Sequence, residues 1–141
     1  MGDLYRVDEA PIDPAEAVRA VTGPDRGAIA TFTGVVRAHD HGRAVLRLEY
    51  HAYREMAERV LRQIGREVEE KFGTPHVAIL HRIGMLEVGE TSVVIAVAAP
   101  HRREALAACA FAIERLKEIA PIWKREHTGE GASWIEGCRD G

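Results

Sequence analysis

The fold of this chain is decided by one stretch of sequence, Ser92-Val93-Val94-Ile95-Ala96-Val97-Ala98-Ala99. Apolar residues fill almost all of it, on both of the faces that a strand presents. A strand with one face in water alternates apolar and polar residues, whereas a strand covered on both faces reads as a continuous apolar run. The sequence therefore predicts a central, covered strand over residues 91–99.

Helices are predicted on either side of this strand in the sequence. Pro100 ends the strand, and a helix is expected over residues 101–119, where Pro121 stops it. A second apolar stripe of helical period runs over residues 53–72, and a short helix is expected over residues 13–22. The expected inward residues of the two long helices are Leu106, Cys109, Ala110, Ile113 and Leu116, and Met56, Val60, Leu61, Ile64 and Val68.

The remaining apolar segments are short and read as strands. They cover residues 27–37, 44–50, 77–83, 122–127 and 133–136. In the first of them, alternation places Thr31, Thr33, Val35 and Arg37 on one face. Hairpins and helices mixed in this order predict an α+β fold with a mainly antiparallel sheet and helices on one face. The length suits a single domain over residues 1–141.

The bulk composition is that of an ordinary globular protein. Hydrophobic residues make up 46% and charged residues 29% of the chain, and the net charge is −3. No apolar run approaches the roughly 20 residues that a membrane-spanning helix needs. The first residues lack the basic and then apolar order of a signal peptide. We therefore expect a cytoplasmic protein that makes no contact with a membrane.

Neither a metal nor a cofactor is expected. Cys109 lies among small helical residues and Cys138 in a polar tail, so the two cysteines form neither a disulfide framework nor a zinc site. His39 and His41 share a face but lack a third ligand of evident spacing. The glycine motifs that bind dinucleotides or nucleotide phosphates do not occur.

A local basic cluster contrasts with the mild overall acidity. Its members are Arg102, Arg103, Arg115, Lys117, Lys124 and Arg125. His101 and Arg102 open the predicted helix, where free backbone N–H groups and the helix dipole favour an anion. Arg37 could reach a phosphate from its strand end, or pair with Glu49 or Asp40. The cluster predicts a pocket for an anion.

Lys117 and Lys124 admit two interpretations. The stem of Lys117 could cover the core at the margin of the apolar stripe while its ammonium reaches water. Alternatively, the two lysines meet on either side of the break at Pro121 and share one pocket. Such a pair costs stability, so it is more often kept as a base or a nucleophile. The dipeptide His81-Arg82, in contrast, is interpreted as a structural strand end that enters a turn.

Short motifs run through nearly the whole chain in a fixed order. They are Gly27-Ala28, Phe32-Thr33-Gly34-Val35-Val36-Arg37, Leu48-Glu49-Tyr50, Tyr53, Met56-Ala57, His81-Arg82-Ile83-Gly84, His101-Arg102, Leu116-Lys117, Pro121-Ile122-Trp123-Lys124-Arg125-Glu126 and Trp134. Together they resemble the catalytic (large) subunit of molybdopterin synthase. Each motif alone is weak, and their shared order makes the match strong. The resemblance implies an α/β hammerhead-type α+β fold.

The resemblance also implies a sulfurtransferase of molybdenum cofactor biosynthesis. Members of that family form a central homodimer, and each protomer binds a small ubiquitin-like sulfur-carrier subunit with a C-terminal Gly-Gly thiocarboxylate, which gives a heterotetramer. Two sulfurs enter cyclic pyranopterin monophosphate to form the dithiolene of molybdopterin. Carried over by motif, Lys117 and Lys124 are the catalytic lysines. The residues expected to line the substrate pocket are Arg37, His101, Arg102, Lys117, Lys124, Arg125 and Glu126.

Two other functions fit the same basic cluster. A non-catalytic anion- or nucleic-acid-binding module could use it, but the net acidity and the 6% of aromatic residues argue against a nucleic-acid surface. A scaffold that only presents the carrier would have no need of two lysines in one pocket. We therefore expect the enzyme, without a nucleic-acid partner. We also expect Lys117 to be the residue that forms an isopeptide bond with the carrier in a side reaction.

Overall fold

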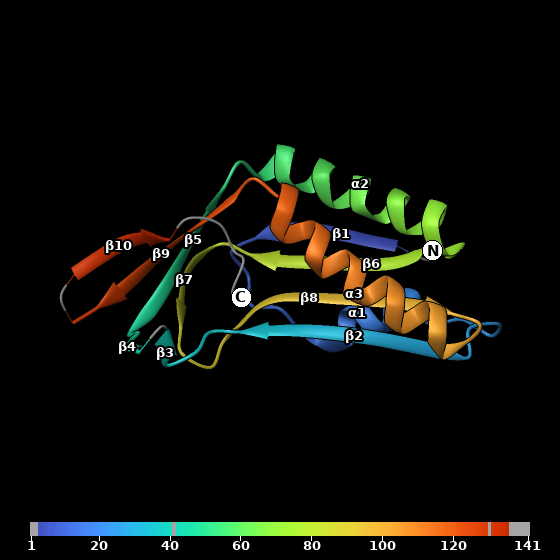
Figure 1. The fold of residues 1–141 in the computed structure, drawn as a ribbon, viewed down its shortest axis with the longest axis horizontal. Coiled ribbons are helices and arrows are strands. Elements are labelled where there is room, and N and C mark those ends of the chain that lie inside the picture. Colours follow the sequence, from blue (N-terminus) through green and yellow to red (C-terminus); the bar gives the residue numbers. More distant parts are fainter. Residues whose placement is uncertain (1–2, 41, 130, 136–141) are drawn as a thin grey trace.

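The computed structural model describes residues 3–40, 42–129 and 131–135, which form two four-stranded sheets, a short hairpin and three helices (Figure 1). The first sheet has the strand order β1-β6-β8-β2, with the bounds Asp3–Asp8, His76–Arg82, Thr91–Ala99 and Ala28–Val35. β1 is parallel to β6, whereas β8 is antiparallel to both β6 and β2. The predicted α+β fold with mainly antiparallel strands is confirmed.

β8 is the strand on which the prediction of the fold depended, and it lies inside the first sheet between β6 and β2. Every residue over 92–99 is buried. Val93 and Ile95 face the larger core, which is covered by α2 (Arg54–Phe72) and α3 (Arg102–Ile119). Val94 and Ala96 face a second core beneath α1 (Pro14–Val21). The expected central strand, covered on both faces, is confirmed.

Helices cover both faces of the first sheet, not one face as expected. α2 (Arg54–Phe72) and α3 (Arg102–Ile119) lie side by side over one face, and α1 (Pro14–Val21) packs on the other (Figure 1). The two-sided arrangement follows from β6 and β8, since each strand is apolar on both faces. With helices on one face only, Leu80 and Val94 would be left in water.

α3 buries Cys109 and Leu116, as predicted, but two other residues of the expected stripe are exposed. Leu106 is 62% exposed and Ala110 is also exposed, so both expectations were wrong. The buried residues of the helix are Ala105, Ala108, Cys109, Ala112 and Leu116. These small side chains let the helix lie close to β2 and β8, and a hydrophobic period alone does not choose between adjacent faces.

α2 buries Leu61, Ile64 and Val68, as predicted, but not Met56. Met56 is 52% exposed, and its place in the interface is taken by small residues. The buried residues are Ala57, Leu61, Ile64, Gly65 and Val68. Gly65 allows the helix to approach β1 closely, because a side chain there would overlap the hydroxyl of Tyr5. Across the described residues, none of the helices is both long enough and apolar enough to cross a bilayer.

The second sheet is antiparallel throughout. Its strand order is β10-β9-β5-β7, with the bounds Gly131–Ile135, Ile122–Thr128, Arg47–Ala52 and Gly84–Glu87. The expected turn near residue 41 is a small hairpin of β3 (His39–Asp40) and β4 (Arg43–Ala44). His41, Glu136 and Cys138 lie outside the described residues.

The two sheets meet at the C-terminal end of α3. The chain passes from β6 into β7 at Gly84, whose φ of 94° is one that side chains rarely adopt. It passes from α3 into β9 through Ala120 and Pro121, because proline cannot continue the helix. Side chains of both sheets and of the last turn of α3 therefore point into one region.

Candidate active site at the junction of the two sheets

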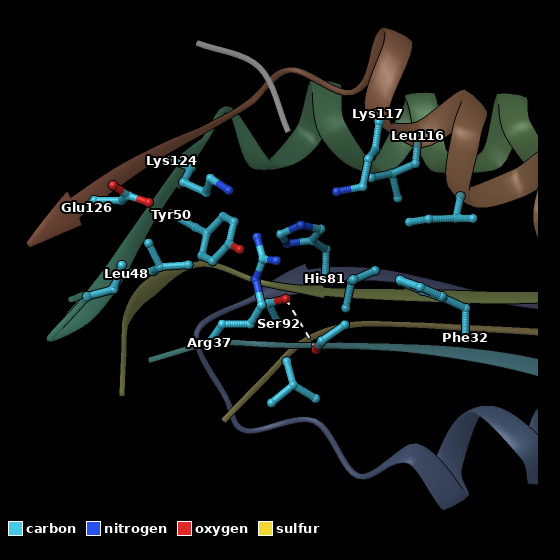
Figure 2. A pocket seen from close by; sticks show the side chains of 15 residues that line it. Phe32, Arg37, Leu48, Tyr50, His81, Ser92, Leu116, Lys117, Lys124 and Glu126 are labelled. Atoms are coloured by element: carbon cyan, nitrogen blue, oxygen red, sulfur yellow. Dashed lines mark hydrogen bonds between the residues drawn. The ribbon is translucent and has the colours of Figure 1, made fainter. Parts of the chain in front are cut away.

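A cavity opens where the two sheets meet α3 (Figure 2). The space free of protein atoms at this place is about 620 Å³, a volume that includes open solvent at the mouth of the cavity. Its polar and charged lining residues are Arg37, Tyr50, His81, Ser92, Lys117, Lys124 and Glu126. Apolar side chains of β2, β5 and α3 complete the wall. The described residues thus bring several basic groups into a partly closed space.

The two lysines of the sequence prediction meet in this cavity. Lys117 is half-buried in the last turn of α3, and Lys124 is only 6% exposed on β9. Figure 2 shows their amines directed into the cavity from opposite sides. An ammonium removed from water is costly, so the enclosed position of Lys124 is more typical of function than of folding. Of the two interpretations, the structure favours the shared pocket.

Arg37 and Glu126 also belong to this cavity, as expected. Arg37 follows the end of β2, and its guanidinium rises toward the lysines in Figure 2. Glu126 is 1% exposed and lies two positions after Lys124, so strand alternation places both on the same face of β9. The cavity therefore combines three basic side chains with a buried acid.

His81 lines the same cavity, although the sequence indicated only a structural role. It is 4% exposed near the end of β6, and its ring packs edge-on against Tyr50 at a centroid distance of 5.2 Å. Burial lowers the pKa of His81 to about 4, and the nearby positive charge of Lys117 acts in the same direction. The ring is therefore neutral near pH 7.

Two expected pocket residues lie far from this cavity within the chain. His101 and Arg102 are exposed at the N-terminal end of α3, whereas Lys117 lies in its last turn. The helix has 18 residues and is about 27 Å long, so the two ends cannot contact the same small molecule. One described protomer does not bring these groups together.

Arg125 also points away from the cavity. It lies between Lys124 and Glu126 on β9, so its side chain emerges on the opposite, outer face of the second sheet. There the guanidinium carbon lies 5.5 Å from the ring centroid of Trp134 on β10. The structure therefore places Arg125 in a cation–π contact, outside the cavity that the resemblance implied for it.

The outer face of the second sheet carries a further polar group. Glu49 accepts hydrogen bonds from the Nε2 atoms of His51 at 2.7 Å and of His127 at 2.9 Å. The bond from His127, followed by the bond from His51, holds the pKa of Glu49 below its usual range. No group of three or more His, Cys, Asp or Glu within residues 3–40, 42–129 and 131–135 could hold a metal ion.

Comparison with known proteins identifies the family. Residues 7–119 match the sequence profile described as MoaE protein. The chain belongs to the MoaE protein family. A relative from Bacillus subtilis, named molybdopterin synthase catalytic subunit, is 47% identical over 133 residues, which are 94% of this chain and 85% of that protein. One of the same name from Pyrococcus abyssi is 45% identical and covers 88% of this chain and 84% of its own length.

Solved structures of this family have the same fold. The molybdopterin synthase structure from Staphylococcus aureus superposes with a TM-score of 0.90 at 42% identity, and covers 94% of this chain and 96% of that one. A complex of subunits 1 and 2 of molybdopterin-converting factor from Helicobacter pylori shares the fold at a TM-score of 0.74 and 20% identity, over 93% and 89% of the two chains. The resemblance to molybdopterin synthase catalytic subunits, and with it the expectation of an enzyme, is confirmed.

Proposed function

We propose that this chain transfers sulfur from the C-terminal thiocarboxylate of a small carrier subunit to cyclic pyranopterin monophosphate, and that the transfer takes place in the cavity at the junction of the sheets. The observation that carries the proposal is the meeting of Lys117 and Lys124 there, from two elements separated by Pro121. The family supplies the reaction, since its relatives are molybdopterin synthase catalytic subunits.

The charges of the cavity suit both reactants. The carrier's thiocarboxylate and the substrate's phosphate are anions, and Lys117, Lys124 and Arg37 are cations that converge on the space between them. Sulfur transfer from a thiocarboxylate develops negative charge on the carbonyl oxygen of the carrier's last residue. Ammonium groups fixed in a partly closed cavity stabilise such charge more than water does, because they need not reorganise during the reaction.

The half-closed shape of the cavity also suits the proposed partner. A flexible Gly-Gly tail is narrow enough to enter a cavity between two sheets, while the folded part of the carrier stays outside. The Helicobacter pylori complex of two subunits is an assembly of a protein with the same fold. We infer that a small carrier subunit docks at the mouth of this cavity.

A second protomer would supply the groups that one chain does not bring to the cavity. His101 and Arg102 lie at the far end of α3, so they can serve a pyranopterin phosphate only in a neighbouring protomer's cavity. A homodimer with two carriers, one for each cavity, fits this division. The proposal therefore predicts a site shared between two copies of the chain.

Reconstitution tests the proposed function. The purified chain is mixed with a thiocarboxylated carrier and the pyranopterin, and dithiolene formation is followed with wild type, Lys117→Ala and Lys71→Ala. Lys71 lies at the end of α2, outside the cavity, and serves as the matched control. Wild type and Lys71→Ala should form product and Lys117→Ala should not. No product from wild type would overturn the proposal.

A further inference from the structure

His81 lines the cavity, although the sequence indicated only a structural role for it. It shares the cavity with Lys117, and the charge of Lys117 acts on its ring. Figure 2 shows the side chain of Lys117 reaching from α3 into the cavity, where its amine lies above the ring of His81 in this view. The two residues come from α3 and β6, which the fold holds at the junction of the sheets.

The hydrogen bond of the ring fixes its tautomer. Nδ1 of His81 lies 2.8 Å from the carbonyl oxygen of Arg82. A carbonyl oxygen only accepts, so Nδ1 carries the proton, and in a neutral imidazole Nε2 then keeps a bare lone pair. The edge-on contact with Tyr50 holds the orientation of the ring. His81 therefore offers the cavity a fixed hydrogen-bond acceptor without a charge.

A neutral acceptor has a specific use beside three cations. A carboxylate next to Lys117 would hold the lysine in place but would also cancel the charge that stabilises a developing oxyanion. A neutral nitrogen lone pair directs an N–H bond of the ammonium and leaves its charge in place. Proton transfer is a different matter, because an imidazole with a pKa of about 4 does not take a proton from an ammonium group whose ordinary pKa is about 10.4.

We propose that His81 is a positioning residue for Lys117: during the reaction the ammonium can turn to donate a hydrogen bond to the bare Nε2, which holds it toward the reacting carbonyl. The reaction in this inference is that of the proposed function, whereas the arrangement of His81 and Lys117 comes from the structure alone. His81 itself exchanges no proton with the reactants. Its effect on the reaction passes through Lys117.

Three variants separate positioning from packing. His81→Phe keeps a ring but has no acceptor, whereas His81→Gln carries an amide oxygen near the place of Nε2. His76→Gln is the matched control, because His76 lies on the same strand, is half-buried and does not line the cavity. Losing a hydrogen bond to a charged group should lower kcat of His81→Phe by roughly ten- to a hundredfold, with KM nearly unchanged. His81→Gln should recover most of kcat, and His76→Gln should match wild type.

A second measurement does not depend on turnover. The chain has three lysines, Lys71, Lys117 and Lys124, so labelling with an amine-reactive reagent can be assigned to each by mass spectrometry. The Nε2 acceptor stabilises the ammonium form of Lys117, so labelling of Lys117 should begin at lower pH in His81→Phe than in wild type. In His81→Gln the pH at which labelling begins should return to the wild-type value. The labelling of Lys71 should follow the same pH curve in all of them.

The outcomes separate the two proposals. If wild type makes no product but the labelling of Lys117 shifts as described, the reaction is wrong and the role of His81 stands. If His81→Phe keeps wild-type kcat and labelling, His81 does not position Lys117. If His81→Phe and His81→Gln lose activity and melting temperature equally, the role is packing and the inference is overturned.

Discussion

The two faces of the second sheet serve different purposes, although the same short run of sequence supplies both. Lys124 and Glu126 face the cavity and are almost fully buried, whereas Trp123 and Arg125, their neighbours on β9, face outward. Trp123 is 46% exposed and Arg125 lies over the ring of Trp134. Strand alternation therefore divides a run that looks like one basic motif, and the cavity is assembled across elements rather than along the sequence.

Lys117, which faces Lys124 across the cavity, should give the strongest loss of activity. Lys117→Ala should lower sulfur transfer by roughly a hundred- to a thousandfold or more, because it removes a charge aimed at the developing oxyanion. The fold should persist, since the side chain is only half-buried, and a circular dichroism melt should stay within a few degrees of wild type. Near-normal turnover in this variant would contradict the proposal that sulfur transfer takes place in the cavity.

The buried ring of His81 in the cavity should make the free energy of unfolding depend on pH. The pKa of His81 is about 4 in the folded chain and about 6.5 when unfolded. As pH falls from 6.5 to 4, the unfolded state binds a proton that the folded state does not, so stability falls over this window by about 3 kcal/mol. Below pH 4 both states are protonated and this loss is complete.

Urea denaturation of wild type and His81→Gln at pH 7, 5.5 and 4 measures this effect. Glutamine does not titrate, so the variant should lose less stability than wild type between pH 7 and 4. Equal losses in the two proteins would show that the ring of His81 binds its proton over the same pH range in the folded and the unfolded chain, which contradicts the lowered pKa.

A variant of Arg102 tests whether the substrate site is completed by a second copy of the chain. Its removal should weaken pyranopterin binding by roughly ten- to a hundredfold through the loss of one charge-assisted hydrogen bond. Carrier binding should change less, because the carrier's tail is assigned to the lysines. The check is a titration of Arg102→Ala with each ligand by calorimetry.

Mixed dimers decide between a shared site and a site within one chain. In a dimer of one Arg102→Ala chain and one Lys117→Ala chain, a shared arrangement leaves one cavity with both wild-type residues. Such dimers should regain activity that the Lys117→Ala homodimer lacks, and should bind the pyranopterin with wild-type affinity at one site. Weak binding at every site of the mixed dimer would place the phosphate elsewhere.

The outer face should give the smallest effect. Arg125→Ala removes the cation–π contact of a half-buried guanidinium and should cost about 0.5–1 kcal/mol of stability. Sulfur transfer should stay within about threefold of wild type, because the side chain does not line the cavity. Lys124→Ala, one residue away, should lose far more sulfur transfer, because Lys124 lines the cavity. Equal loss in the two variants would contradict the division of β9 into two faces.

The sequence predicted the framework of the fold because its strongest signals are local. The apolar run over residues 92–99 indicated a covered strand, and proline marked the end of α3. The inward faces of the long helices were predicted less well. Close packing on a sheet favours small residues such as Ala108, while hydrophobicity favours large ones such as Leu106.

Family motifs predicted several of the residues that line the cavity, but they did not predict those that only the tertiary structure brings there. Lys117, Lys124, Arg37 and Glu126 meet in one cavity, as the family motifs implied. His81 was missed, because only the register of β6 against its neighbours and the position of α3 bring its ring beside Lys117. No spacing within the sequence carries that information.

The position of the carrier's tail can be located by covalent linkage. A C-terminal carboxylate held beside an ammonium group can condense with it, and the chain has three lysines, of which Lys71 lies outside the cavity. The chain is incubated with the carrier, and any isopeptide linkage is mapped by mass spectrometry. Linkage at Lys117 is the predicted result, with none at Lys71. Linkage at Lys71 in place of Lys117, or a complex without linkage at either cavity lysine, would contradict entry of the tail into this cavity.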